Sequence, residues 1–237
     1  MHPILLKLGP VTVYSYGAFV ALGFAAAAFL IYRRAAHFGI DKDNAMDLVI
    51  LMLVSGVVGA RLFYVLLNMA YYRANPYEII NLSRGGLVWY GSFFAAIGSA
   101  VIYIKRRKIG FLNAMDLIVP YIALAQAFGR AGCFFNGCCY GLDGIPIQLY
   151  SSFLLVVIFV LLVYWQDRRR FKGEIALGYC MLYPLKRFGV EFFRGDNLRI
   201  FSGLTISQVI SLFVFIIAAL IFIKKVYEWK ERDTVSK

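Results

Sequence analysis

The chain has 237 residues, of which 61% are hydrophobic, 17% are aromatic and only 16% are charged. A composition this apolar excludes a soluble domain of that length. The net charge of +12 does not indicate a nucleic-acid partner, because the cations stand in short runs at the ends of apolar segments rather than in a separate basic domain.

Seven apolar segments follow one another along the chain, and most approach the roughly 20 residues that a membrane-spanning helix needs. They cover residues 14–32, 46–67, 87–104, 112–128, 147–165, 175–185 and 204–223. The sixth is short and contains Pro184, so it is either a broken helix or continues to Phe193 as an amphipathic extension. The pattern predicts an all-α, polytopic integral membrane protein with about seven transmembrane helices.

Basic residues stand at every second boundary between these segments. The basic runs occupy residues 33–34, 105–108, 168–172 and 224–225. Lysine and arginine are enriched at the cytoplasmic ends of membrane segments, so these four boundaries are expected in the cytoplasm. The prediction places the N-terminus outside and the C-terminus in the cytoplasm, with residues 68–86, 130–146 and 186–203 on the outer face.

Segment 129–141, GRAGCFFNGCCYG, puts one arginine, one asparagine and three cysteines among four glycines. So many glycines are expected to interrupt a helix. In a membrane protein, irregular backbone is tolerated where it is buried in protein or lines a wet cavity. Arg130 could snorkel to the lipid headgroups, but an arginine beside open glycine backbone is also suited to holding a phosphate.

Three charged residues, Arg187, Glu191 and Arg194, fall at spacings i, i+4 and i+7. On a helix they would share one face as a salt-bridge ladder. At the end of a membrane span, two arginines and one glutamate also leave net positive charge facing the space between helices. An anionic ligand is the natural complement of that charge.

Two other segments contain residues of a functional type. Arg61 lies several residues inside the second apolar segment, where an arginine requires an acidic or phosphate partner. Trp89 and Tyr90 stand near the start of the third segment. They are typical of an aromatic belt at the level of the headgroups, or of a site residue at the same depth.

In their order along the chain, these motifs resemble the bacterial prolipoprotein diacylglyceryl transferase family from nearly one end to the other. The resemblance is carried by Tyr16-Gly17, GARLFYV around Arg61, GGL at 85–87, Asp116, GR with N and a final G in 129–141, QLY at 148–150, Tyr183, RFGVEFFR at 187–194 and GLTISQ at 203–208. Singly these motifs are weak, but in this order they are specific.

The resemblance implies a multi-pass enzyme of the bacterial cytoplasmic (inner) membrane whose active site faces the outer side. The enzyme would transfer the diacylglyceryl group of phosphatidylglycerol to the thiol of a lipobox cysteine in a prolipoprotein signal peptide. Residues 1–223 would form one transmembrane catalytic domain, and residues 224–237 a short basic cytoplasmic tail. Phosphatidylglycerol, prolipoprotein signal peptides and the lipid bilayer are the implied partners, with no metal and no organic cofactor.

Individual residues acquire roles from the same resemblance. Arg130 and Arg187 match the family's two essential arginines, which would hold the phosphate as it becomes a leaving group. Glu191 is expected to orient Arg187. Substrate contacts and polar supports of the site are implied at Tyr16, Arg61, Asp116, Asn136, Gly141, Tyr183 and Arg194.

The chain departs from the family pattern in the catalytic region. Tyr90 stands in the place of a histidine, Cys133 in that of an asparagine and Cys138 in that of a glutamate, while Ser151 replaces the glutamate after QLY. Tyr90 is a catalytic candidate, but a tyrosine with a free pKa of about 10 is a poor base at neutral pH. The group that activates the acceptor thiol therefore stays open.

The cysteines allow four interpretations. They fill space where small residues are needed, or Cys133 or Cys138 is a nucleophile activated by a nearby arginine. They could also form a disulfide on the oxidising outer face, although the adjacent pair Cys138 and Cys139 would be strained. Metal binding would need Cys180 as a fourth ligand. That residue lies inside the sixth segment, and paired CxxC units are missing, so no metal is predicted.

Two alternative functions remain beside the transferase. One is a homologous lipid transferase with a different acceptor, which the cysteine-rich departures would allow. The other is an anion or lipid transporter, in which the same arginines form a site at a broken helix. A transporter requires charges through the depth of the membrane, and Asp116 is the main charge away from the outer face.

Overall fold

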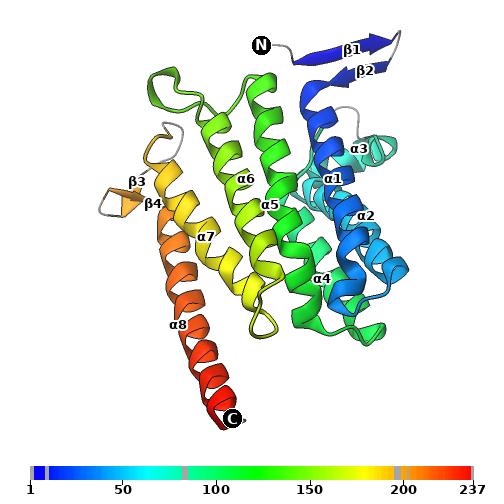
Figure 1. Ribbon diagram of the computed structural model, residues 1–237. Coiled ribbons are helices and arrows are strands. Elements are labelled where there is room, and N and C mark those ends of the chain that lie inside the picture. The colour runs from blue at the N-terminus through cyan, green and yellow to red at the C-terminus, as the bar shows by residue number, and fades with distance from the viewer. Residues whose placement is uncertain (1–2, 9–10, 82–84, 195–198, 202, 236–237) are drawn as a thin grey trace. The chain divides into compact units, whose positions relative to one another are not determined.

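The computed structural model describes residues 3–8, 11–81, 85–194, 199–201 and 203–235 (Figure 1). Helices make up most of this chain, which confirms the prediction of a helical protein. Two short antiparallel hairpins accompany the helices and were not predicted. One pairs β1 (Ile4–Leu8) with β2 (Val11–Tyr14), and the other pairs β3 (Arg199–Phe201) with β4 (Leu204–Thr205).

Each predicted apolar segment contains one long helix. The α-helices within the described residues are α1 (Ser15–Arg34), α2 (Lys42–Leu67), the short α3 (Met69–Ala74), α4 (Trp89–Arg106), α5 (Phe111–Asn136), α6 (Ile147–Gln166), α7 (Glu174–Glu191) and α8 (Ile206–Val235). Five of them, α1, α2, α5, α6 and α8, are long and apolar enough to cross a membrane. The chain is therefore a multi-pass membrane protein.

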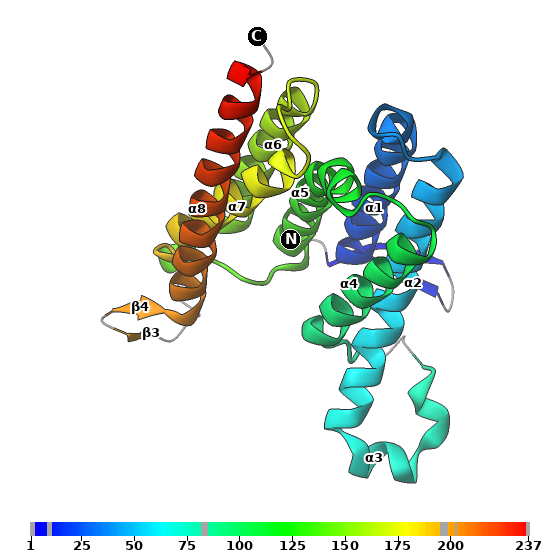
Figure 2. The same ribbon diagram turned by 90° about the horizontal axis from the view of Figure 1, so that it is seen from below.

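The chain divides into two compact units, residues 32–114 and the remainder. In the unit formed by residues 32–114, α2 and α4 pack side by side (Figure 2). Gly59 and Gly91 allow the two backbones to approach, because a Cβ atom on Gly91 would lie only 2.6 Å from that of Phe63. Small residues are typical of such close contacts between membrane helices. Ser55 and Ser99 add a hydrogen bond of 2.7 Å between the same helices.

Arg61 of α2 fastens the connection between α3 and α4. Its five N–H donors lie 2.6–3.1 Å from five backbone carbonyl oxygens, which belong to Glu78, Ile79, Asn81, Gly85 and Gly86. A guanidinium has five donors in all, so these carbonyls use its full capacity. They satisfy the buried charge in place of the acid or phosphate expected from the sequence.

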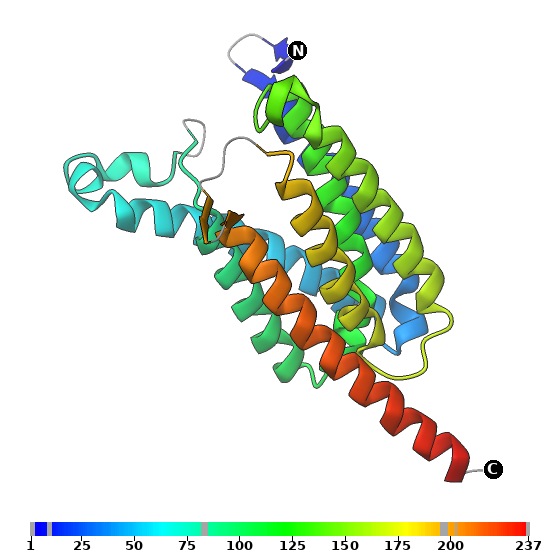
Figure 3. The same cartoon turned by 90° about the vertical axis from the view of Figure 1, so that its left-hand side faces the viewer.

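In the other unit, α5, α6 and α7 enclose an apolar core. Its buried members are Ala123, Ala127, Leu155, Ile158, Leu162 and Ile175. Helix α8 packs along α7 and continues beyond its start (Figure 3). A hydrogen bond of 2.8 Å from the Ser152 hydroxyl to the carbonyl of Ala127 ties α6 to α5.

Helix α5 continues through the segment that was expected to be irregular. The expectation of a broken helix from residue 129 is wrong as far as Asn136, and only residues 137–141 leave the helix. Each glycine costs a helix about 1 kcal/mol. Packing offsets this cost at Gly132, where a Cβ atom would lie 3.1 Å from the Cβ of Phe19 and 3.3 Å from the Cα of Tyr16. The glycine lets α1 press against α5.

Helix α7 resolves the two alternatives for the sixth segment. The helix is continuous from Glu174 to Glu191 with Pro184 inside it. The segment therefore continues as an extension beyond the apolar part and is not broken at the proline. Arg187 and Glu191 lie on this helix, whereas Arg194 follows its end, so the expectation that all three share one helix face is wrong for Arg194.

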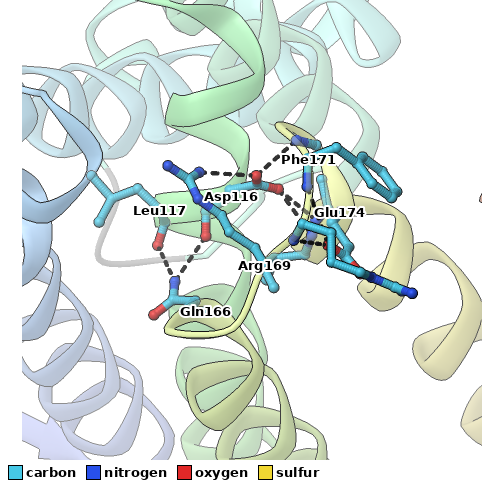
Figure 4. A network of polar contacts seen from close by, with 10 residues as sticks. Asp116, Leu117, Gln166, Arg169, Phe171 and Glu174 are labelled. Carbon is cyan, nitrogen blue, oxygen red and sulfur yellow. Dashed lines mark hydrogen bonds and ion pairs between the residues drawn. The ribbon is translucent and has the colours of Figure 1, made fainter. Parts of the chain in front are cut away.

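Asp116, buried near the start of α5, caps the N-terminus of α7 (Figure 4). Its Oδ1 accepts the N–H groups of Ile175 and Ala176 at 3.0 Å, and its Oδ2 accepts that of Gly173 at 2.7 Å. Arg169 pairs with the same carboxylate at 3.2 Å. The first N–H groups of a helix have no partners within the helix, so a carboxylate placed here satisfies them and complements the helix dipole.

We expect Asp116→Asn to lower the free energy of unfolding by about 3 kcal/mol. The amide retains one acceptor oxygen but turns an NH₂ group toward the N–H donors of α7, and it leaves Arg169 without its ion pair. Thermal unfolding in detergent measures the loss. Asp47→Asn is the matched control, because the Asp47 side chain is 54% exposed and its change should have little effect. Equal stability of the two variants would contradict the role of the cap.

Arg61→Lys should destabilise the protein by about 2 kcal/mol, because an ammonium group has three donors and loses at least two of the five charge-assisted hydrogen bonds to backbone carbonyls. The melting temperature in detergent again provides the measurement. Arg73→Lys, at an exposed position of α3, makes the same exchange away from these five carbonyls. If both lysine variants have the melting temperature of the wild type, the five hydrogen bonds of Arg61 do not stabilise the fold.

Candidate active site

Four cationic side chains gather where α5 and α7 end. Arg130 lies near the C-terminal end of α5, Lys186 and Arg187 lie in the last turns of α7, and Arg194 follows that helix. Lys186 lies within range of electrostatic interaction with the three arginines. Within the described residues, the carboxylate recorded beside this cationic cluster is that of Glu191. The cationic cluster thus carries an excess of positive charge.

Glu191 holds Arg187 in place from a buried position. Its side chain is fully buried, and its Oε2 lies 3.2 Å from Nη2 of Arg187. The hydroxyl of Thr205 donates to the other carboxylate oxygen at 2.9 Å. Nη2 of Arg187 also donates to the hydroxyl of Ser207 at 3.1 Å. Arg187 is therefore fixed by its own helix and by the start of α8.

The motif GLTISQ forms the N-terminal cap of α8. Gln208 Oε1 accepts the N–H of Thr205 at 2.9 Å, and Thr205 Oγ1 accepts the N–H of Gln208 at 3.3 Å. This reciprocal pair is a capping box, in which N-cap and third residue satisfy each other's backbone donors. The cap places the hydroxyl groups of Thr205 and Ser207 at Glu191 and Arg187.

The end of α5 brings two cysteines together. Gly137 adopts a left-handed conformation with φ of 76°, and the N–H groups of Gly137 and Cys138 bond to the carbonyls of Phe134 and Cys133 at 3.2 Å. This pattern is the Schellman motif, which places the residue after the left-handed position against the third residue before the end of the helix. Here those two residues are Cys138 and Cys133.

Cys139 joins them, and the three sulfur atoms lie within 4.8 Å of one another. All four cysteines of the chain are free thiols, and Cys180 does not belong to this group. Burial raises the pKa of the Cys139 thiol, as does Cys138 beside it, against the opposing charges of Arg130 and Arg194. Cys139 is therefore a protonated thiol at neutral pH, and the hypothesis of a nucleophile at Cys133 or Cys138 stays a prediction.

Gly141 joins two parts of the chain. A Cβ atom at this position would lie 2.8 Å from the carbonyl oxygen of Phe193 and 3.0 Å from that of Ile145. The next residue, Leu142, donates its N–H to the same Phe193 oxygen at 2.8 Å, and Gly141 forms a β-bridge with Arg194. Because Gly141 has no side chain, the backbone of Phe193 and Arg194 can lie directly against it. This contact fixes the backbone that leads into Arg194.

The remaining predicted site residues divide between the two units. Tyr16 lies beside α5 in the turn that contains Arg130 and Cys133. Asn136 is exposed at the last position of α5. Tyr183 stacks on Tyr179 with ring centroids 5.3 Å apart, and Lys186 lies over the Tyr183 ring at 5.1 Å.

Tyr90 belongs, like Arg61, to the unit of residues 32–114. Its side chain is 61% exposed and stands edge-on to Trp89.

A pocket opens beside the cationic cluster, between α6 and α7. It measures about 490 Å³ and is lined by Ile145, Ile147, Tyr150, Leu154, Leu185, Lys186, Gly189, Val190 and Phe193. Its walls are apolar apart from Lys186 and the tyrosine hydroxyl. Arg187 was predicted from the sequence, whereas Lys186, Thr205 and Ser207 were assigned no individual role. Lys186 could have been noticed as a second cation next to Arg187 at the end of an apolar segment.

Residues 3–224 match the family described as prolipoprotein diacylglyceryl transferase. The chain belongs to this family. Similar proteins carry the name phosphatidylglycerol–prolipoprotein diacylglyceryl transferase. The one from Clostridium tetani is 34% identical over 242 residues, covering 94% of the chain and 97% of the relative. Those from Clostridium novyi and Finegoldia magna are 34% and 33% identical, each covering 96% of the relative. The predicted family is confirmed, and with it a transferase of lipoprotein biosynthesis.

Thr205→Val should lower both stability and transferase activity, although the residue lies outside the cationic cluster itself. Valine keeps the shape of threonine but loses the cap of α8 and a donor to buried Glu191, at a cost of about 2 kcal/mol. Thermal unfolding and an activity assay below the melting temperature measure the two effects. Thr234→Val is the control, since that hydroxyl bonds only to the exposed carbonyl of Lys230. Unchanged activity would show that Arg187 needs no support from Thr205.

Proposed function

We propose that the chain transfers the diacylglyceryl group of phosphatidylglycerol to the thiol of a lipobox cysteine in prolipoproteins, at the outer leaflet of the bacterial inner membrane. The observation that carries this proposal is the excess positive charge of Arg130, Arg187 and Arg194 beside an apolar pocket. A glycerolipid phosphate combines the two chemistries that such a site accepts. The names of the relatives supply the donor and the acceptor.

The arginines act on the phosphate of the donor. In the transfer, the sulfur of the acceptor cysteine bonds to the glyceryl carbon, and the bond from that carbon to the phosphate oxygen breaks. Glycerol phosphate leaves, the diacylglyceryl group remains on sulfur as a thioether, and the thiol proton passes to the surroundings. Negative charge grows on the departing oxygen, where fixed cations lower the barrier most because they are already oriented.

Arg130 and Arg187 differ in how they serve this step. Arg187 is held by Glu191 and Ser207, so its guanidinium keeps one orientation. Among the residues that the structure describes, Arg130 forms no hydrogen bond or ion pair, and its donors remain for a ligand. Arginine binds phosphate through parallel N–H groups, which a lysine cannot imitate.

The apolar pocket is suited to the lipid part of the donor. Leu154 of α6 and Leu185 and Val190 of α7 line it, and Lys186 brings a cation to its wall. Its volume falls within the 300–1,000 Å³ range that is usual for small-molecule sites. An acyl chain placed there would leave the phosphate at the cationic cluster.

The proposed topology adds α4 and α7 to the five helices that are long and apolar enough to cross a membrane. Each has 18 residues, a length of about 27 Å at 1.5 Å per residue, which is close to the hydrocarbon thickness of a bilayer. Seven spans with the basic boundaries in the cytoplasm put the N-terminus outside, the cationic cluster at the outer face and residues 224–237 in the cytoplasm.

Transfer of radiolabelled diacylglyceryl from phosphatidylglycerol to a lipobox peptide tests the proposal in membranes that lack any other such transferase. Arg130→Ala and Arg187→Ala should each reduce the rate at least about 100-fold, because each removes one fixed cation from the leaving phosphate. Arg106→Ala, at the exposed end of α4, is the matched control and should retain activity.

Full activity of the double variant Arg130→Ala, Arg187→Ala would refute the mechanism. A different acceptor would be indicated if lipobox peptides stayed unlabelled while another thiol or an alcohol received the lipid. Rescue of growth in a strain that lacks its own diacylglyceryl transferase tests the same assignment in cells.

A further inference from the structure

Cys133, Cys138 and Cys139 form a cluster of three thiols that the proposed transfer does not use. Their sulfur atoms all lie within 4.8 Å of one another. The side chains are half-buried, so an ion could reach them from outside. Three sulfur donors at such distances form a ligand set for a soft metal ion.

The distances are close to those of a bound ion. A zinc–sulfur bond of 2.3 Å in a tetrahedral site places three sulfurs around one ion about 3.8 Å apart. The observed limit of 4.8 Å therefore requires each sulfur to move by less than about 1 Å, which rotation of a cysteine side chain allows. A fourth position is left for water, as in zinc sites with three protein ligands.

The backbone holds the three thiols in this arrangement. The Schellman motif at Gly137 sets Cys138 against Cys133, and Gln148 donates to the carbonyl of Cys138 at 2.6 Å. Cys139 has a φ of 64°, a conformation that is uncommon for residues other than glycine and persists where the surroundings enforce it. The ligand set is thus largely formed before an ion arrives.

The surrounding charge favours the metal-bound state. Three thiolates and one divalent ion carry a net charge of −1, and Arg130 stands three residues before Cys133 on α5, where side chains at this spacing are neighbours. A bound metal–thiolate group would attract Arg130, the residue proposed to hold the lipid phosphate. Occupancy of the thiols therefore competes with the donor for this arginine.

We propose that Cys133, Cys138 and Cys139 bind one thiophilic metal ion of the Zn²⁺, Cd²⁺ or Cu⁺ type, and that the bound ion inhibits transfer. Binding stands independently of the proposed function, whereas the inhibition rests on it. The sequence alone did not predict a metal, because a site with three ligands lacks the paired CxxC units and the fourth cysteine that are typical of zinc sites.

The test uses the purified full chain in detergent, kept reduced with a phosphine that does not itself contain a thiol. Cd²⁺ titration should produce the ultraviolet charge-transfer band of cadmium thiolate with a stoichiometry of one. Cys133→Ser, Cys138→Ser and Cys139→Ser should each weaken binding at least about 100-fold, since even the loss of an outer-shell partner costs up to that factor. Cys180→Ser is the matched control and should bind as the wild type.

Wild-type binding by the triple serine variant would overturn the site, as would a Cys133–Cys138 disulfide that persists in the reductant. The inhibition is tested separately by adding Cd²⁺ to the transfer assay. The wild type should lose activity at the concentration that fills the site, and the triple serine variant should resist. Full transfer by metal-saturated wild type would overturn the inhibition, whereas no transfer by metal-free protein would count against the proposed function alone.

Discussion

The carboxylate of Asp116 accepts the first N–H groups of α7 and thereby fixes where that helix begins relative to α5. The two helices start at the same end of their unit and run in parallel. Arg130 lies 14 residues beyond Asp116, about 21 Å along α5, and Arg187 lies 12 residues beyond Ile175, about 18 Å along α7. The cap at one end therefore sets the register that brings the two arginines together at the other.

Charged residues in this chain serve either the fold or the site, and their hydrogen bonds distinguish the two groups. Arg61 donates all five N–H groups to backbone carbonyls. The carboxylate of Asp116 accepts the first N–H groups of α7. The polar atoms of both side chains are therefore occupied by the fold and not by a ligand. Asp116 was the charge that could have marked a transport path through the membrane. As a satisfied cap it provides no step in such a path, which leaves the transporter hypothesis without that support.

The sequence predicted each long helix because an apolar run is a local property, but it could not predict contacts that depend on distant residues. The helix through residues 129–136 was missed because the cost of Gly132 is local, whereas its benefit lies in contact with α1. The partners of Arg61 come 17 to 25 residues later in the chain. The contact of Cys133 with Cys138 could have been predicted from the sequence, because Gly137, just before Cys138, is typical of the Schellman motif at the end of a helix.

Repulsion within the cationic cluster has a consequence for how the unit is stabilised. Among the residues that the structure describes, Lys186, three arginines and the carboxylate of Glu191 lie together where α5 and α7 end, and repulsion among the basic side chains opposes the packing of those ends. Apolar contacts among α5, α6 and α7 and the Asp116 cap hold the helices together despite it, but they act toward the other end and the middle of the unit. A lipid phosphate that enters the cationic cluster replaces repulsion with charge-assisted hydrogen bonds. Donor binding and the stability of this end of the unit are therefore linked, because a ligand that binds only the folded state stabilises it.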